Sequence, residues 1–218
     1  MAKTILSANQ QQFLPLFSTS KFSKNFYLTG GTALAEHYIQ YRKSEDLDFF
    51  SEIEIDAQSI AVFLKSIKKK LDYNSFDLNT SFNRNIIHLL FAKETLKLEF
   101  TYFPFPQIEK PLKKEGVLVD SVLDIAVNKL FTIYQKPRSR DYIDLYMVNK
   151  KYGFEIEKLL KNAKIKFDWH IDPIKLGAQF LEADKVRDYP ILFVPLKKRL
   201  WVDYFKSEAK KLESAIFK

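Results

Sequence analysis

The sequence predicts an α+β protein whose first half combines strands with helices and whose second half is helical. Strand-like and helix-spaced apolar segments both occur in the first half. Three prolines between residues 104 and 111 then interrupt the pattern, and the apolar segments beyond them recur at helical spacing. We therefore expect two domains, an α/β core over residues 1–115 and a helical domain over residues 116–218.

In the first half, the apolar residues of segment 60–71 are spaced as on one face of a helix. Segments 76–82, 86–92 and 96–103 are rich in strand-forming residues and are separated by short polar turns. The other expected elements are a short helix or irregular arm over 5–20 interrupted by Pro15, a strand over 26–28, a helix over 32–41 and a strand over 46–50.

The second half is expected to contain a series of helices. The first begins at Asp120-Ser121 and runs through Tyr134, and Ser121-x-x-Asp124 resembles a capping box. From residue 185 onward Lys and Arg outnumber Asp and Glu. The further helices are expected over 141–149, 155–163, 173–183 and 198–216.

Composition narrows the class of protein. The chain has 218 residues and no cysteine, which excludes disulfides, a thiolate nucleophile and cysteine-ligated metals. The first twenty residues carry no long apolar run, so we expect neither a signal peptide nor a membrane span, and we expect the cytoplasm. The net charge of +8 favours acidic partners such as nucleotides, RNA or an acidic protein.

Two aspartates, Asp46 and Asp48, flank one apolar residue in an otherwise apolar segment. In a strand their side chains share one face. Carboxylates held side by side repel each other unless a cation or a proton lies between them, and their hard oxygens suit Mg²⁺. A divalent-metal site is therefore the first hypothesis. Exposed acids on an edge strand, or a salt bridge to Arg42, are the alternative.

Glu99 is a third candidate ligand. It lies within the apolar segment 96–103, on the face opposite Leu98 and Phe100. If this segment neighbours the aspartate pair, three carboxylates meet and can hold two metal ions and deprotonate an attacking hydroxyl. The sequence leaves that neighbourhood open, and an ion pair with Lys97 or a solvated position is the alternative.

Gly30, Gly31 and Thr32 fall where a strand is expected to turn into a helix. Glycine adopts dihedrals that other residues avoid, and the free N–H groups of a helix start suit phosphate. The Thr32 hydroxyl could add a contact. A tight turn without a ligand is the alternative.

Lys129 lies beside the apolar stripe of the helix expected to end at Tyr134. It could neutralise charge on phosphates, or be a surface lysine with a buried stem. Asp141 and Asp144 are three residues apart and so share a helix face. They could orient Lys129 or Arg140, or serve as helix N-terminal acids.

Together these segments resemble the AbiEii/AbiGii toxin-type nucleotidyltransferases, members of the polymerase-beta-like nucleotidyltransferase superfamily. The resemblance rests on Leu-Thr-Gly-Gly-Thr-Ala-Leu at 28–34, Arg-x-Ser-x-Asp-Leu-Asp-Phe-Phe at 42–50 and the later block at 123–145. It covers roughly residues 24–150. It implies a small mixed sheet with flanking helices, followed by a helical domain.

The resemblance also implies roles for the candidate residues. Gly30, Gly31 and Thr32 would hold nucleotide phosphates. Asp46 and Asp48 would bind Mg²⁺, with Glu99 as the third acid. The residues of the later block that would act near the nucleotide are Lys129, Arg140, Asp141 and Asp144, of which Lys129 and Asp141 are also expected to be catalytic.

The expected function is thus Mg²⁺-dependent transfer of a nucleotidyl group from an NTP to an acceptor hydroxyl, with release of pyrophosphate. In the resembling family the acceptor is RNA, notably the tRNA 3′ end, in a toxin–antitoxin setting. The expected partners are an NTP, RNA and an antitoxin protein. Two alternatives are a catalytically weak nucleotide- or partner-binding module with the same fold, and a pure RNA-binding protein.

Overall fold

The computed structural model describes residues 4–216, which fold into two compact units. The first unit contains the chain up to Gln40 together with Ser44–Ser121. The second contains the short segment Tyr41–Lys43 and the chain from Val122 onward. The first unit thus reaches slightly beyond residue 115, where the sequence predicts the boundary.

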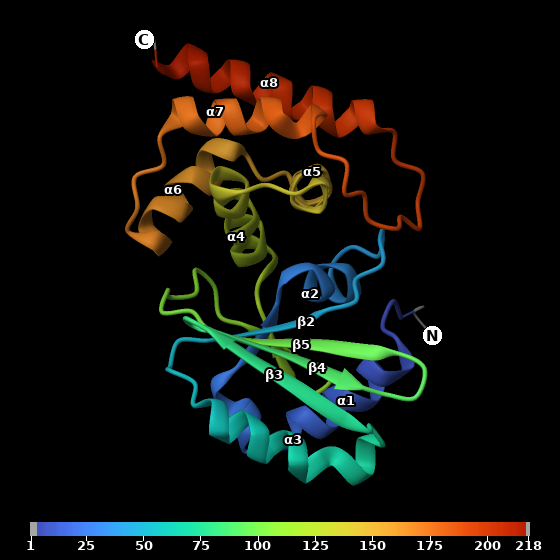
Figure 1. Cartoon of the computed structure of the whole chain (residues 1–218). Helices are drawn as coiled ribbons and strands as arrows, with labels where there is room; N and C mark the ends of the chain where they lie inside the picture. The colour runs from blue at the N-terminus through green and yellow to red at the C-terminus, as the bar shows by residue number, and fades with distance from the viewer. Residues whose placement is uncertain (1–3, 217–218) are drawn as a thin grey trace. The chain divides into compact units, whose positions relative to one another are not determined.

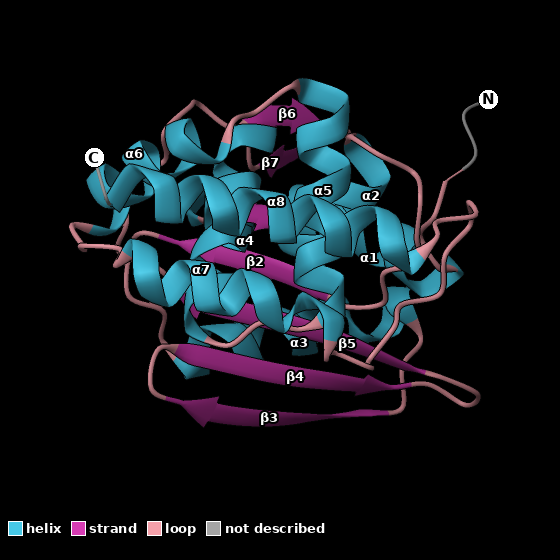
Figure 2. Cartoon of the chain, turned by 90° about the horizontal axis from the view of Figure 1, so that it is seen from above, coloured by secondary structure: helices cyan, strands magenta, loops and turns pink. Residues whose placement is uncertain are grey.

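The first unit is built on a mixed sheet, which in the described residues has seven strands in the order β3-β4-β5-β2-β1-β7-β6 (Figure 2). The inner strand β2 pairs antiparallel with β1 and parallel with β5. The strands are β1 Tyr27–Thr29, β2 Leu47–Ser51, β3 Ser75–Ser81, β4 Arg84–Leu90, β5 Thr95–Tyr102, β6 Leu112–Lys114 and β7 Val117–Val119.

Helices cover both faces of this sheet. Figure 1 shows α1 and α3 on one face and α2 on the other. Phenylalanines fill the layer between the sheet and the first pair: Phe17 of α1 lies 4.3 Å from Phe49 and 5.9 Å from Phe63, measured between ring centroids. The helices of this unit are α1 Ala8–Ser18, the 3₁₀ turn η1 Phe22–Asn25, α2 Gly30–His37 and α3 Ala57–Leu71.

The second unit is helical. Its helices α7 and α8 lie side by side (Figure 1) and enclose a buried aromatic group that includes Trp201, Phe205 and Phe180. The elements are α4 Val122–Gln135, α5 Ser139–Tyr152, α6 Ile156–Phe167, α7 Pro173–Leu181, η2 Glu182–Asp184 and α8 Lys198–Ile216. No helix in the described residues is long and apolar enough to cross a membrane.

The segment Tyr41–Lys43 is tied to the second unit by its backbone. The amide of Lys43 donates to the carbonyl of Ile191 at 2.9 Å, and the amide of Phe193 donates to the carbonyl of Tyr41 at 2.8 Å. These two bonds frame an isolated antiparallel bridge between Arg42 and Leu192. A piece of the chain that precedes the aspartate pair therefore belongs to the helical unit.

The predicted α+β class is confirmed, and the long periodic segments form the elements expected of them. Two strands, β6 and β7, are absent from the expectations because the nearby prolines indicate a break in the chain. Residues 8–18 form a helix even though Pro15 lies inside it. Helix α2 begins earlier than expected, at Gly30, and ends at His37.

A candidate nucleotidyl-transfer site

Asp46, Asp48 and Glu99 lie on one face of the sheet, which we call the acid face. Strands β2 and β5 are parallel neighbours, and Asp48 is in register with Glu99. Side chains alternate along a strand, so these residues point away from the face on which Phe49 and Phe100 are buried. The sequence does not tell whether the strand of Glu99 lies next to the strand of the aspartate pair. The pairing of β2 with β5 shows that it does, and it brings Glu99 beside the pair.

Two cations from the same sheet contact the acid face. Lys97 Nζ lies 2.7 Å from Asp46 Oδ2. Arg84 donates two hydrogen bonds to Glu99, from Nε at 2.8 Å and from Nη2 at 2.6 Å, and the Thr101 hydroxyl donates a third at 3.1 Å. Neither ion-pair alternative from the sequence occurs, since Asp46 pairs with Lys97 and Glu99 with Arg84. In this arrangement no three metal-ligating side chains within residues 4–216 already converge on one point.

Gly30 is packed against the carboxylate of Asp48. Its φ of +71° lies in the left-handed region, which favours glycine. A Cβ added at this position would lie 2.5 Å from Asp48 Oδ2, too close for any side chain. The turn from β1 into α2 thus places the N-terminus of a helix directly beside one carboxylate of the acid face.

Thr32 holds the segment that carries Asp46. Its side chain is buried, and its hydroxyl donates to the backbone carbonyl of Asp46 and lies 2.8 Å from the Ser44 hydroxyl oxygen. The hydroxyl therefore fixes the backbone just before β2, and so the position from which the Asp46 side chain projects.

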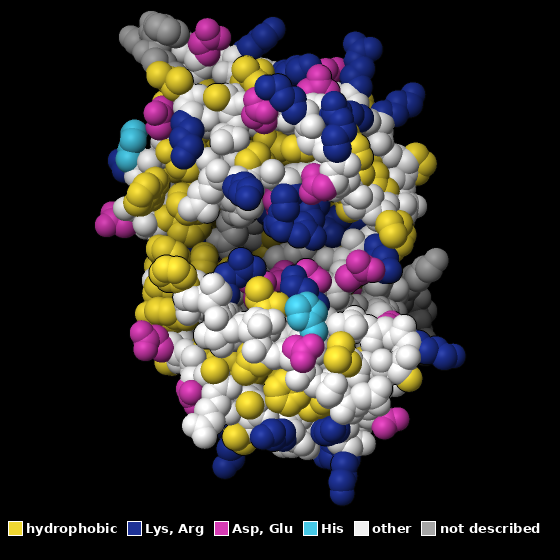
Figure 3. All heavy atoms as spheres, in the orientation of Figure 1, with side chains coloured by type: hydrophobic (Ala, Val, Ile, Leu, Met, Phe, Trp, Pro, Cys, Tyr) yellow, Lys and Arg dark blue, Asp and Glu magenta, His cyan; other side chains and the backbone are white. Residues whose placement is uncertain are grey.

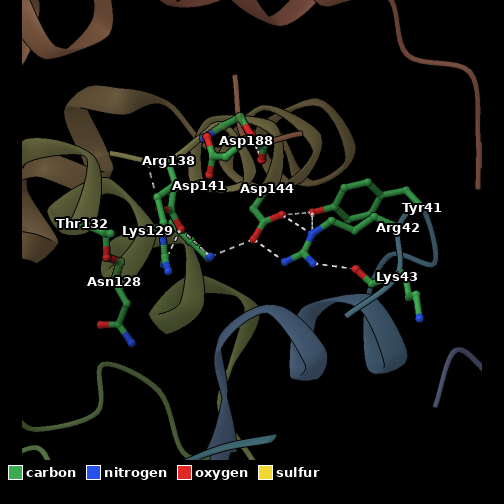
Figure 4. Close-up of polar contacts among 11 residues, drawn as sticks. Tyr41, Arg42, Lys43, Asn128, Lys129, Thr132, Arg138, Asp141, Asp144 and Asp188 are labelled. Atoms are coloured by element: carbon green, nitrogen blue, oxygen red, sulfur yellow. Dashed lines mark hydrogen bonds and ion pairs between the residues drawn. The ribbon is translucent and has the colours of Figure 1, made fainter. Parts of the chain in front are cut away.

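The second unit contains a buried group of charged and polar residues, drawn in Figure 4, which we call the buried ion network. Its members are Tyr41, Arg42, Lys129, Asp141 and Asp144. Lys129 of α4 lies between two aspartates of α5, with its Nζ 2.8 Å from Asp141 Oδ1 and 2.8 Å from Asp144 Oδ2. The side chain of Lys129 is 10% exposed and the two aspartate side chains are 0% exposed. The aspartates therefore orient Lys129 and balance its charge.

Asp144 also receives the side chains of Tyr41 and Arg42. Arg42 forms a bidentate pair with it, from Nε to Oδ1 at 2.7 Å and from Nη2 to Oδ2 at 2.9 Å. The Tyr41 hydroxyl donates to Oδ1 as well. Because the Arg42 side chain is only 4% exposed, this is an ion pair removed from water.

Opposite charges keep this network ionised. Burial alone would raise the pKa of the Asp144 carboxyl, but the charges of Lys129 and Arg42 and their hydrogen bonds hold that pKa below its usual range. Burial alone would lower the pKa of Lys129, and the charges of Asp141 and Asp144 raise it above its ordinary value instead. For Tyr41, burial and then the charge of Asp144 raise the pKa, so its hydroxyl stays protonated.

Two arginines flank the start of α5. Arg138 donates from Nε to Asp141 Oδ2 at 3.0 Å, so it extends the buried ion network toward solvent. Arg140 is half-buried and has no ion-pair partner in the part of the chain that the structure describes.

Sequence reasoning missed Arg84 on the acid face and Tyr41 in the buried ion network. It named Lys97 and Arg42 only as alternative partners, Lys97 of Glu99 and Arg42 of the aspartate pair, whereas Lys97 pairs with Asp46 and Arg42 with Asp144. Arg42 and Asp144 are 102 residues apart, and no local pattern signals their pairing.

The model of a family described as the nucleotidyl transferase AbiEii toxins of type IV toxin–antitoxin systems matches residues 12–212. The chain belongs to this AbiEii family. It is therefore a nucleotidyltransferase, as its motifs predict. The match extends well beyond residues 24–150, the part in which the sequence motifs lie, and includes most of the helical unit.

Relatives of this AbiEii chain share its sequence or its fold. An uncharacterised protein of Aquifex aeolicus, aq_aa25, is 29% identical over 167 residues, which cover 74% of this chain and 76% of the relative. The crystal structure of JHP933 from Helicobacter pylori superposes with a TM-score of 0.62 at 22% identity, over 95% of this chain and 90% of that one.

A third relative is a toxin with the same fold. The nucleotidyltransferase toxin MenT4 of Mycobacterium tuberculosis superposes on this AbiEii chain with a TM-score of 0.56 at 17% identity, over 94% of this chain and 81% of that one. At these identities the two solved structures show that the fold is shared.

Proposed function

We propose that this chain transfers a nucleotidyl group from an NTP to an acceptor hydroxyl, with Mg²⁺ held at the acid face. The observation that carries the proposal is the contact between Gly30 and Asp48, because a helix start that suits phosphate then lies beside a carboxylate that suits magnesium. The amides of Gly30 and Gly31 at the start of α2 suit phosphate, and the carboxylates of Asp46 and Asp48 suit magnesium.

The residues of the acid face fit a magnesium ion. Mg²⁺ is usually bound by one or two carboxylates, with waters and substrate phosphates completing its shell. Asp46 and Asp48 provide two carboxylates on one face, and Glu99 is in register with the second of them. Once bound, the metal neutralises charge on the phosphates and makes the acceptor hydroxyl easier to deprotonate.

We assign separate roles in this reaction to the chain's own residues. Gly30 and Gly31 bind phosphate oxygens through their amides, and Thr32 keeps Asp46 in place through its backbone carbonyl. In the reaction the acceptor oxygen bonds to the α-phosphorus, the bond from that phosphorus to pyrophosphate breaks, and the acceptor proton passes to the acid face. Glu99 is the carboxylate to which we assign this proton.

We further propose that Arg140 and Lys129, residues of the later sequence block, have roles in nucleotide binding. Arg140 has no ion-pair partner among the described residues, so its charge is available to an anion. Lys129 is balanced by Asp141 and Asp144, so we assign it a role through the buried ion network, with both aspartates fixing its position.

RNA is the acceptor that we propose, notably the tRNA 3′ end, in the cytoplasm and under the control of an antitoxin protein. The family consists of toxins of type IV toxin–antitoxin systems, and MenT4 is itself described as a nucleotidyltransferase toxin. The chain has a net charge of +8, and Figure 3 shows Lys and Arg side chains spread over the visible face with one dense group among them. Such a surface favours a polyanion.

Transfer can be measured directly. The protein is incubated with Mg²⁺, total tRNA and each NTP in turn, labelled at the α-phosphate, and label in the RNA is counted. Incorporation from at least one NTP is expected. If calorimetry shows that the protein binds a magnesium–NTP complex but no acceptor gains label, the chain is a binding module with the same fold. RNA binding that survives replacement of both Asp46 and Asp48, without transfer by the wild type, indicates an RNA-binding protein.

A further inference from the structure

The carboxylates of the acid face already have cationic partners that project from the same sheet. Lys97 precedes Glu99 by two residues along β5, and its Nζ lies 2.7 Å from Asp46 Oδ2. Arg84 lies at the start of β4 and donates two hydrogen bonds to Glu99. Among the described residues, Lys97 and Arg84 thus each pair with a carboxylate of the acid face.

Neither cation is locked in place. The side chains of Lys97 and Arg84 are 32% and 53% exposed, so water reaches both cations, although Glu99 itself is only 9% exposed. The pair of Lys166 and Asp124 in the second unit offers a contrast, since both of its side chains are 0% exposed. Long, partly exposed side chains can leave a carboxylate at small cost, whereas a fully buried pair cannot.

Arg84 responds to more than one acid. Its hydrogen bonds to Glu99, and the charges of Glu99 and Asp48, raise the pKa of Arg84 against the opposing effect of burial. Arg84 thus lies within the electrostatic field of the part of the acid face where a metal ion would also lie.

We propose that Lys97 and Arg84 are built-in counter-cations, which occupy the carboxylates of the acid face when no metal is bound and so set the Mg²⁺ concentration at which the face is filled. This inference rests on the metal site of the proposed function. A divalent ion must compete with both side chains for carboxylate oxygens. The two cations therefore lower the affinity for Mg²⁺ and stabilise the metal-free protein.

Removing either cation should have two linked effects. The potential at the acid face becomes more negative and carboxylate oxygens are released, so Mg²⁺ binds about two- to fivefold more tightly, the range that matches loss of one partly exposed ion pair. Without metal the same variant has less positive charge to balance its neighbouring carboxylates, so it melts at a lower temperature.

The test uses Lys97→Met and Arg84→Met, which keep the apolar stem and remove the charge. Lys93→Met is the matched control, because Lys93 is an exposed lysine between β4 and β5 with no ion-pair partner in the described residues. Magnesium chloride is titrated by calorimetry without nucleotide, and the melting temperature is measured in chelator and in Mg²⁺. The first two variants should bind Mg²⁺ more tightly and gain more melting temperature from it than the wild type and Lys93→Met.

The outcomes separate this inference from the function on which it rests. If the wild type binds Mg²⁺, Asp48→Asn does not, and Lys97→Met and Arg84→Met bind as the wild type does or more weakly, the counter-cation role is overturned and the metal site stands. If neither the wild type nor any variant binds Mg²⁺ or gains melting temperature from it, the metal site and the counter-cation role are both overturned.

Discussion

Replacing Asp144 with asparagine should destabilise the second unit strongly. The substitution removes the one negative charge that Arg42 and Lys129 share, while both cations stay buried. An asparagine accepts at one atom only, so it cannot reproduce the bidentate pair with Arg42 and the bond from Lys129 together. Breaking a buried ion pair by removing one partner costs about 3–5 kcal/mol. That is a large part of the 5–15 kcal/mol that typically stabilises a domain.

Urea unfolding followed by tryptophan fluorescence measures this loss selectively. The two tryptophans of the chain, Trp169 and Trp201, both lie in the second unit, and Trp201 is buried against Tyr142 of α5. The matched control is Asp203→Asn, which breaks an exposed pair with Arg199 and should change the free energy of unfolding by less than about 1 kcal/mol. A loss in Asp144→Asn as small as that of the control would refute the importance of the buried ion network.

Two further outcomes follow from the same structure. The folded-state pKa of Asp144 is depressed, so the contribution of this residue to stability is present above the unfolded pKa of about 3.9 and is lost as the pH falls toward the folded value. The urea midpoint of the wild type should therefore drop as the pH is lowered below about 5. The midpoint of Asp144→Asn should drop less. Gly30→Ala should destabilise the first unit by at least about 1–2 kcal/mol and weaken Mg²⁺ binding, because it adds a left-handed strain and a clash with Asp48. Gly177→Ala, a helix position with open space around it, should be neutral or stabilising when both are compared by circular dichroism.

Local patterns were sufficient to predict which face of a strand each residue occupies. The alternation of charged and apolar residues around Asp48 and Phe49 places the aspartates opposite the phenylalanine core, as the structure shows. Helical spacing likewise predicted the segment that forms α3, with its five buried apolar residues on one side. These features depend on neighbours within a few residues, which is why sequence alone reveals them.

Pairings between distant segments could not be predicted in this way. The sequence shows that Glu99 shares a face with Lys97, yet only the parallel register of β2 and β5 sets it beside Asp48. The hairpin register that brings Arg84 to Glu99 is equally a tertiary property. The strand β7 escaped prediction because its three residues lie soon after prolines, and its pairing with β1 needs a contact far along the chain.

The central claim is that the acid face beside Gly30 carries out nucleotidyl transfer. Its most direct test compares label transfer from an α-labelled NTP to tRNA by the wild type, by Asp48→Asn and by Asp77→Asn. The last variant makes the same change of charge at an exposed position of the edge strand β3. We predict that Asp48→Asn abolishes transfer while its fold is retained, and that Asp77→Asn transfers as the wild type does. Undiminished transfer by a folded Asp48→Asn protein would contradict the claim.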